Sequence, residues 1–185
     1  MSHPTIEDVF LTHLQDAHAL EKLVDTALGA LISTAGAPEL RDLLQHHREL
    51  TRAHLAALED RLAAHEQHPS APKDSGLAAA ALAEGLLARV RADHAGKHAL
   101  DAYTLVHAAV AGYELLRHLA QRAGDTATAE VAARHLADER ATAAAVDDKW
   151  DLLLDVSLRH AGVLSAPPPG TTRSLRGIAG GDRQR

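Results

Sequence analysis

The sequence predicts an all-α protein, built as a bundle of four long helices, and three observations support this fold class. Hydrophobic residues make up 46% of the 185-residue chain but aromatic residues only 2%, so the core is expected to be built from Leu, Ala and Val. Such a core favours helices packed side by side over β sheets, which are enriched in aromatic and β-branched residues. Apolar residues also recur at helical spacing along four long segments, and Gly, Pro and Asp turn signals end these segments.

The first two helices are expected over about Pro4–Thr34 and Pro38–Glu66. Thr5 is suited to be the N-cap of the first, and Pro38 fits the first turn of the second. The turn between them is only a few residues long. We therefore expect two antiparallel neighbours.

The connection to the third helix is much longer, at about 30 residues. It begins with a loop rich in Pro and Ser over His68–Gly76 and continues with a short alanine-rich helix over about Leu77–Arg91. Gly96 then interrupts the helical pattern. We therefore expect a long crossover that carries a short extra helix.

The last two long helices are expected over about Lys97–Arg122 and Thr126–His160, with a turn at Gly124–Asp125. A long crossover between two antiparallel pairs lets the second and third helices run parallel, which is the ferritin-like arrangement. Gly162 ends the last helix. The sequence thus predicts one bundle domain over residues 1–162 and a Pro-rich linker with a disordered tail over residues 163–185.

Composition excludes several classes of function. The net charge of −6 indicates no general affinity for nucleic acids or anionic membranes. The chain contains no cysteine, and no apolar stretch approaches the roughly 20 residues of a membrane span. The absence of cysteine leaves the compartment open, with the cytoplasm as the default, and no signal peptide is recognised at the N-terminus. We find no nucleophile motif, phosphate-binding loop or nucleic-acid motif.

Several polar side chains fall on the apolar stripes that face the core. Glu21 lies on the first-helix stripe, and Glu139 lies one turn after His135 on the fourth. A carboxylate is costly to bury unless it is paired, protonated or bound to a metal ion. The inward polar set comprises His18, Glu21, His47, Thr51, His54, His135 and Glu139.

Two interpretations of this polar set stay open. Imidazole and carboxylate groups together suit a site for iron, zinc or manganese, and one ion needs only three or four of them. Alternatively, histidines and glutamates can form a buried hydrogen-bonded layer that fixes the register of the bundle. The candidate metal ligands are Glu21, Glu139, His47, His54, His18 and His135.

Other polar residues are expected at the surface. Glu49 falls on the outer face of its helix, Glu114 with Arg117 or His118 reads as a surface ion pair, and Arg134 with Asp138 reads as another. Tyr103 and Tyr113 are expected in the third-helix interface, with their hydroxyls reaching polar partners. The histidines expected to be solvated are His46, His65, His94, His98 and His160.

Four segments resemble, in order, the helix signatures of the YciE/YciF-type ferroxidase family of ferritin-like proteins. These segments are Leu14–Lys22, Pro38–Glu59, Gly112–Gly124 and Leu136–Thr142. The resemblance covers about Ile6–Leu154. It implies a four-helix bundle with a di-iron carboxylate site, a stress-associated role and a homodimer, and it places Glu21 and Glu139 at ligand positions.

The sequence departs from the family pattern on two helices. On the second helix, Leu50 holds the inward place and Glu49 points outward, where the family has paired glutamates. On the third helix, Val106–Ala109 contains no carboxylate where the family has two. We therefore expect a reduced or lost di-iron site, with an altered His/Glu metal site or ferroxidase as the alternative.

The tail suggests a further, non-enzymatic alternative. Ser174–Ile178 is a short apolar and basic string that follows a proline linker. It resembles the C-terminal peptides that load ferritin-like cargo into encapsulin shells. The resemblance implies an encapsulin shell as a partner.

Overall fold

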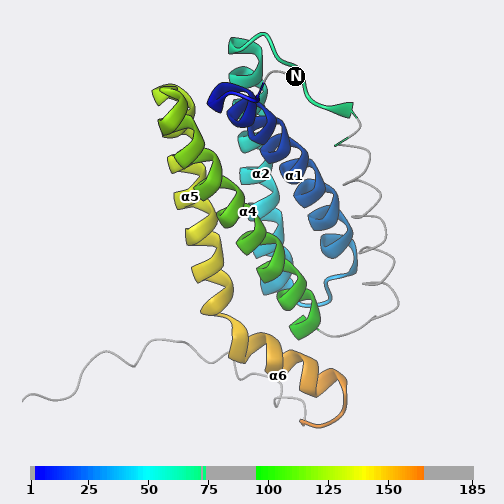
Figure 1. Ribbon diagram of the computed structural model, residues 1–185. Coiled ribbons are helices and arrows are strands. Elements are labelled where there is room, and N and C mark those ends of the chain that lie inside the picture. The colour runs from blue at the N-terminus through cyan, green and yellow to red at the C-terminus, as the bar shows by residue number, and fades with distance from the viewer. Residues whose placement is uncertain (1–2, 72, 74–94, 165–185) are drawn as a thin grey trace, which may run out of the picture.

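The structure is a computed structural model that describes residues 3–71, 73 and 95–164. Within these residues it contains helices and no strand. Four long helices form a bundle, and a shorter helix lies across one end of it (Figure 1). Their bounds are α1 Ile6–Thr34, α2 Pro38–Ala64, α4 Ala95–Ala123, α5 Thr126–Asp147 and α6 Trp150–His160. The predicted all-α bundle is confirmed.

The helices follow the expected ferritin-like topology. In Figure 1, α1 and α5 run toward the end of the bundle where α6 lies, whereas α2 and α4 run away from it. Helix α1 packs against α2 and α4, and α5 packs against α4 and α2. The parallel pairs thus lie diagonally across the bundle. The short crossover helix expected at Leu77–Arg91 lies outside the described residues.

Local sequence signals account for the starts of the long helices. The Thr5 hydroxyl accepts a hydrogen bond from the Asp8 backbone N–H at 3.1 Å, and the Asp8 carboxylate accepts one from Thr5 N–H at 2.8 Å. This capping box satisfies two backbone donors at the start of α1. Pro38 opens α2, and the Asp125 side chain caps α5.

The expectation of one continuous fourth helix is wrong. Helix α5 ends at Asp147 and α6 begins at Trp150, with a turn between them. The turn lets α6 pack against α4, where the Ser157 hydroxyl accepts a hydrogen bond from the Gly96 N–H at 2.8 Å. Ser157 thereby satisfies a backbone donor in the first turn of α4, which is a reason for the chain to bend here.

The apolar core is divided into two clusters. One lies among the early parts of α1 and α5 and the ends of α2 and α4, and includes Phe10, Leu14, Leu58 and Leu116. The other lies nearer α6 and includes Leu28, Leu40, Leu44, Ala99 and Leu153. On α1 and α2 the inward polar side chains fall between these clusters in sequence, and on α5 Glu139 follows Leu136, the last residue of the first cluster. The bundle thus has a polar layer between two apolar halves.

Two histidines that were expected to be solvated are not. His98 is 2% exposed, in the first turns of α4. His65 is half-buried at the C-cap of α2, and its Nε2 lies 2.6 Å from the Asp125 carboxylate. Periodicity does not report such packing at helix ends. No helix among the described residues is both long and apolar enough to span a membrane.

Candidate metal centre

Glu21 lies in the polar layer, where α1 contributes it between Leu14 and Leu28. Its side chain is 1% exposed, as the stripe predicts. The Tyr113 hydroxyl on α4 donates a hydrogen bond of 2.6 Å to Glu21 Oε1. Burial and the neighbouring Glu21 charge raise the pKa of Tyr113 well above its usual value, so the phenol keeps its proton. Glu21 Oε2 is buried and has no hydrogen-bond partner among the described residues.

Glu139 enters the same layer from α5 and is fully buried. His47 on α2 lies beside it, with Nε2 3.1 Å from Glu139 Oε2. Burial alone would raise the pKa of Glu139, but the contacts with His47 and His54 lower it below its usual value. Glu139 is therefore ionised, and its Oε1 makes no hydrogen bond within the described part of the chain.

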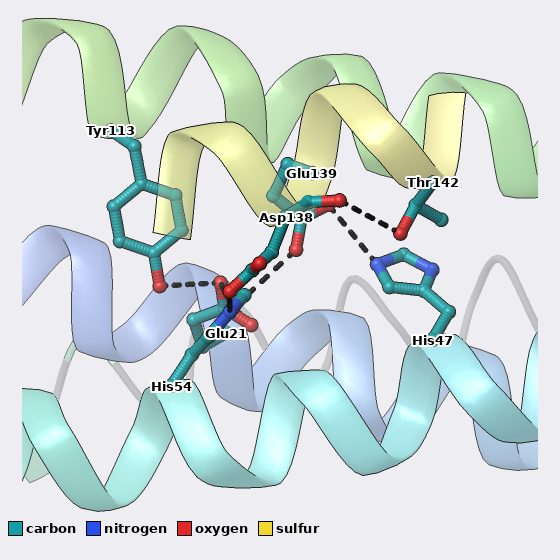
Figure 2. Close-up of polar contacts among 7 residues, drawn as sticks. All are labelled: Glu21, His47, His54, Tyr113, Asp138, Glu139 and Thr142. Atoms are coloured by element: carbon teal, nitrogen blue, oxygen red, sulfur yellow. Dashed lines mark hydrogen bonds and ion pairs between the residues drawn. The ribbon is translucent and has the colours of Figure 1, made fainter. Parts of the chain in front are cut away.

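His54 lies between the two glutamates (Figure 2). Its Nδ1 is 3.5 Å from Glu21 Oε1 and 3.5 Å from Glu139 Oε1, distances of ion pairs rather than of well-formed hydrogen bonds. Its Nε2 is 3.2 Å from Asp138 Oδ2. Burial lowers the pKa of His54, but Glu139, Glu21 and Asp138 together raise it to about 10. Without a metal ion, the ring is an imidazolium held by carboxylates.

His135 stacks on the His54 ring, with a centroid separation of 4.0 Å and an angle of 22° between the planes. Burial and the His54 cation lower the pKa of His135 to about 3, so this ring is neutral at physiological pH. Tyr113 contacts both rings edge-on, at centroid distances of 5.6 Å and 5.0 Å. The stack limits the positions open to the His54 ring.

Three ligand atoms converge in this layer. One ligand atom each from Glu21, His54 and Glu139 lie within 4.8 Å of one another, and all three side chains are buried. They come from α1, α2 and α5, while α4 supplies Tyr113 (Figure 2). A separation of this size allows three side chains to contact one ion after small rotations, since ligand bonds to zinc are about 2.0–2.2 Å long.

The other predicted ligands take different places. His47 lies behind Glu139, and His135 lies against the face of His54. His18 is buried, but its Nε2 is 3.3 Å from Oε1 of Glu59, an exposed residue on α2. These three are not in the group of converging atoms. The metal-binding role of all six residues stays a prediction.

The sequence did not predict that Asp138 borders the site, and it predicted a polar partner for Tyr113 without identifying it. Asp138 was expected to pair with Arg134 at the surface, but its carboxylate contacts His54 instead. The position of Asp138 next to the inward-facing Glu139 was the sequence signal that could have indicated this contact. The hydroxyl of Tyr113 was expected to reach a polar partner, and that partner is Glu21.

Two expectations for the surface hold. Glu49 is exposed, and Glu114 pairs with Arg117 at 2.7 Å and with His118 at 3.3 Å. The polar face of α4 is therefore distinct from the buried layer.

Solved structures of other proteins share this fold. The E. coli stress protein YciF matches with a TM-score of 0.71 and 22% identity, over 80% of this chain and 96% of that one. A protein from Xanthomonas campestris pv. campestris matches equally well by these two measures, over 85% of this chain and 98% of that one. YcfI from Rhodopseudomonas palustris matches with a TM-score of 0.69 and 22% identity, over 78% and 94%.

A family model identifies the group to which the chain belongs. The model described as "Domain of unknown function (DUF892)" matches residues 5–154, which include all four long helices and every residue of the polar layer. The match agrees with the YciE/YciF-type resemblance of the four helix segments and with the shared fold of YciF. The chain therefore belongs to the DUF892 family and has the bundle fold of the YciF-type proteins.

Proposed function

We propose that the chain binds a single divalent metal ion through Glu21, His54 and Glu139. The observation that supports this proposal is the convergence of three buried ligand atoms from three helices within 4.8 Å. Buried polar atoms are rarely left without partners. Glu21 Oε2 nevertheless lacks a hydrogen bond to any described residue, and the contact of Glu139 Oε1 with His54 Nδ1, at 3.5 Å, is an ion pair too long for a well-formed hydrogen bond.

The donor set fits a transition metal ion. Two carboxylates and one imidazole suit iron, zinc or manganese, and the two negative charges match one divalent cation. When the ion binds, the His54 imidazolium would release the proton on Nδ1 to solvent and keep the one on Nε2, so that the lone pair of Nδ1 becomes available. Bound iron would supply redox chemistry to the site, and this chain would contribute the ligands, their orientation and the exclusion of water by the apolar halves.

The proposal is for one ion rather than two. A di-iron carboxylate site in a ferritin-like bundle draws glutamates from all four helices. The described core of this chain offers only Glu21 and Glu139, because Val106 and Ala109 are buried apolar residues on α4. We therefore propose a reduced, mononuclear site and not a complete di-iron centre.

A second candidate role is purely structural, and the His54 contacts favour it. An imidazolium that lies 3.5 Å from two carboxylates is already neutralised to a large extent without a metal ion. Such a network can fix the register of four helices by penalising packings that leave its charges unpaired. The structural role predicts the same buried layer but no metal uptake.

Metal analysis separates the two roles. Untagged protein is loaded with Zn²⁺, with Mn²⁺, or with Fe²⁺ without oxygen, desalted, and analysed by elemental mass spectrometry. We expect about one ion per chain for at least one metal, and less than about 0.2 would overturn the proposal. Glu21→Gln should lose the ion, whereas Glu49→Gln, which changes an exposed carboxylate on α2, should retain it.

The wider role is proposed from a similar protein rather than from the site. YciF is described as a stress protein, and we propose a stress-associated role for this chain on that similarity alone. A homodimer and a cytoplasmic location stay predictions. The segment Ser174–Ile178, which was predicted to load the protein into an encapsulin shell, lies outside the described residues, and none of the matched structures supports that prediction.

A further inference from the structure

We propose that Asp138 is a positioning residue that presents Nδ1, rather than Nε2, of His54 to the metal ion. This inference rests on the proposed metal site and adds the choice of ligand atom. Asp138 Oδ2 lies 3.2 Å from His54 Nε2, while Nδ1 of the same ring lies 3.5 Å from both Glu21 and Glu139. The His54 ring thus presents Nε2 to Asp138 and Nδ1 to the two glutamates.

The tautomer follows from this placement. A neutral imidazole carries one proton, and a carboxylate next to Nε2 keeps the proton on that nitrogen. The lone pair of Nδ1 then faces the two glutamates. A carboxylate behind a ligating histidine fixes the orientation of the ring and raises its basicity.

Asp138 lies at the boundary between the buried layer and solvent. The Thr142 hydroxyl donates a hydrogen bond of 3.0 Å to the Asp138 backbone carbonyl. The Asp138 side chain is 47% exposed, so its charge stays hydrated although it contacts a ring that is 2% exposed. Consecutive residues on a helix point about 100° apart, which places Glu139 inside the bundle and Asp138 at its boundary.

The packing around His54 fixes the plane of its ring. His135 stacks on one face at 4.0 Å, and Tyr113 meets it edge-on at 5.6 Å. Flipping the ring would bring Nε2 toward the glutamates and leave Nδ1 toward Asp138. The packing restrains the plane of the ring, and Asp138 selects which nitrogen faces the site within that plane.

The proposal is tested by zinc titration of Asp138 variants. Asp138→Ala should weaken the affinity for Zn²⁺ by about 10- to 100-fold, in line with other carboxylates behind metal-bound histidines. Asp138→Asn keeps a hydrogen-bond acceptor without the charge, so its affinity should lie between those of Asp138→Ala and the wild type. Glu130→Ala is the matched control, because it removes an exposed carboxylate from the same helix and should leave the affinity within about twofold.

Nitrogen-15 NMR of the zinc-loaded wild type provides a readout that needs no variant. We expect the His54 spectrum of a ring bound through Nδ1 and protonated at Nε2. Binding through Nε2, or an Asp138→Ala affinity within twofold of the wild type, would overturn the inference. If the wild type itself takes up no metal, the proposed function fails and this inference fails with it. If Glu21→Gln loses zinc while Asp138→Ala keeps full affinity, only this inference fails.

Discussion

Among the described residues, two buried or partly buried groups that combine carboxylates with histidines differ in how completely their polar atoms are hydrogen-bonded. The first is the polar layer around Glu21, His54 and Glu139. The second, here called the Asp125 cluster, contains Arg61, His65, Asp125 and Thr128 at the start of α5. Asp125 Oδ1 accepts a hydrogen bond of 2.9 Å from the Thr128 N–H, and Oδ2 accepts one of 2.6 Å from the Thr128 hydroxyl.

The Asp125 cluster continues across to α2. His65 Nε2 and Arg61 Nη2 lie 2.6 Å and 3.1 Å from Asp125 Oδ2, and Arg61 Nε donates a hydrogen bond of 2.9 Å to Thr128 Oγ1. Both oxygens of the carboxylate are thus satisfied at a helix N-terminus, where negative charge is favoured. This cluster connects the C-terminal end of α2 to the start of α5, and both oxygens of its carboxylate are used in these contacts.

The contrast indicates what each cluster does. A histidine beside an acidic residue is common to both, so residue type alone does not distinguish a metal site from a helix cap. The distinguishing feature is that buried carboxylate oxygens in the layer, Glu21 Oε2 and Glu139 Oε1, lack hydrogen bonds to the described residues. Mutations in the polar layer and in the Asp125 cluster should therefore differ in the size of their effects and in the property that they change.

The largest effect on stability is expected in the layer. In metal-free protein, Glu139→Ala should lower the free energy of unfolding by about 3–5 kcal/mol, because it leaves the buried His54 cation without one of its carboxylates. Urea denaturation followed by circular dichroism measures this change. Glu130→Ala, on the exposed face of the same helix, should change the stability by no more than about 0.5 kcal/mol. A loss for Glu139→Ala no larger than that of the control would show that the layer is not an ion-pair network.

A smaller effect is expected in the Asp125 cluster. Asp125→Ala removes the N-cap of α5 and its bonds to α2, and should lower the free energy of unfolding by about 1–2 kcal/mol. The same urea experiment gives this value, and zinc uptake of the variant should equal that of the wild type. Loss of metal from Asp125→Ala while the fold is intact would contradict the separation of the two clusters.

The sequence predicted the bundle because its signals are local or periodic. Apolar stripes gave four long helices, and short-range cap chemistry gave their starts at Thr5, Pro38 and Asp125. The break after Asp147 was missed because no Gly or Pro marks it. The bend lets Ser157 contact Gly96, and these residues lie 61 positions apart in the sequence. The periodicity of apolar residues along a helix does not reveal a contact between residues so far apart in the sequence.

The sequence predicted which residues lie in the polar layer better than it predicted how their side chains are arranged. Helical spacing correctly placed Glu21, His47, His54, His135 and Glu139 inside the bundle. Spacing along one helix cannot show which nitrogen of His54 meets which neighbour on another helix, nor that Asp138 reaches across to α2. Those relations depend on the axial register of α2 against α5, which a single sequence does not report.

The smallest effect is a pH dependence, and it isolates the charge of Asp125 from its capping role. Burial would raise the pKa of Asp125, but hydrogen bonds from Thr128, His65 and Arg61 hold it well below its ordinary value. A lowered pKa in the folded state contributes stability that is present above the unfolded pKa, about 3.9, and is lost as the pH falls toward the folded value.

Asparagine is also a good N-cap residue, so Asp125→Asn keeps the cap and removes only the charge. The difference in unfolding free energy between wild type and Asp125→Asn should therefore be constant above about pH 5 and shrink steadily as the pH falls below about 4. A difference that stays constant down to pH 2 would mean that the ion pairs with Arg61 and His65 add nothing to the cap.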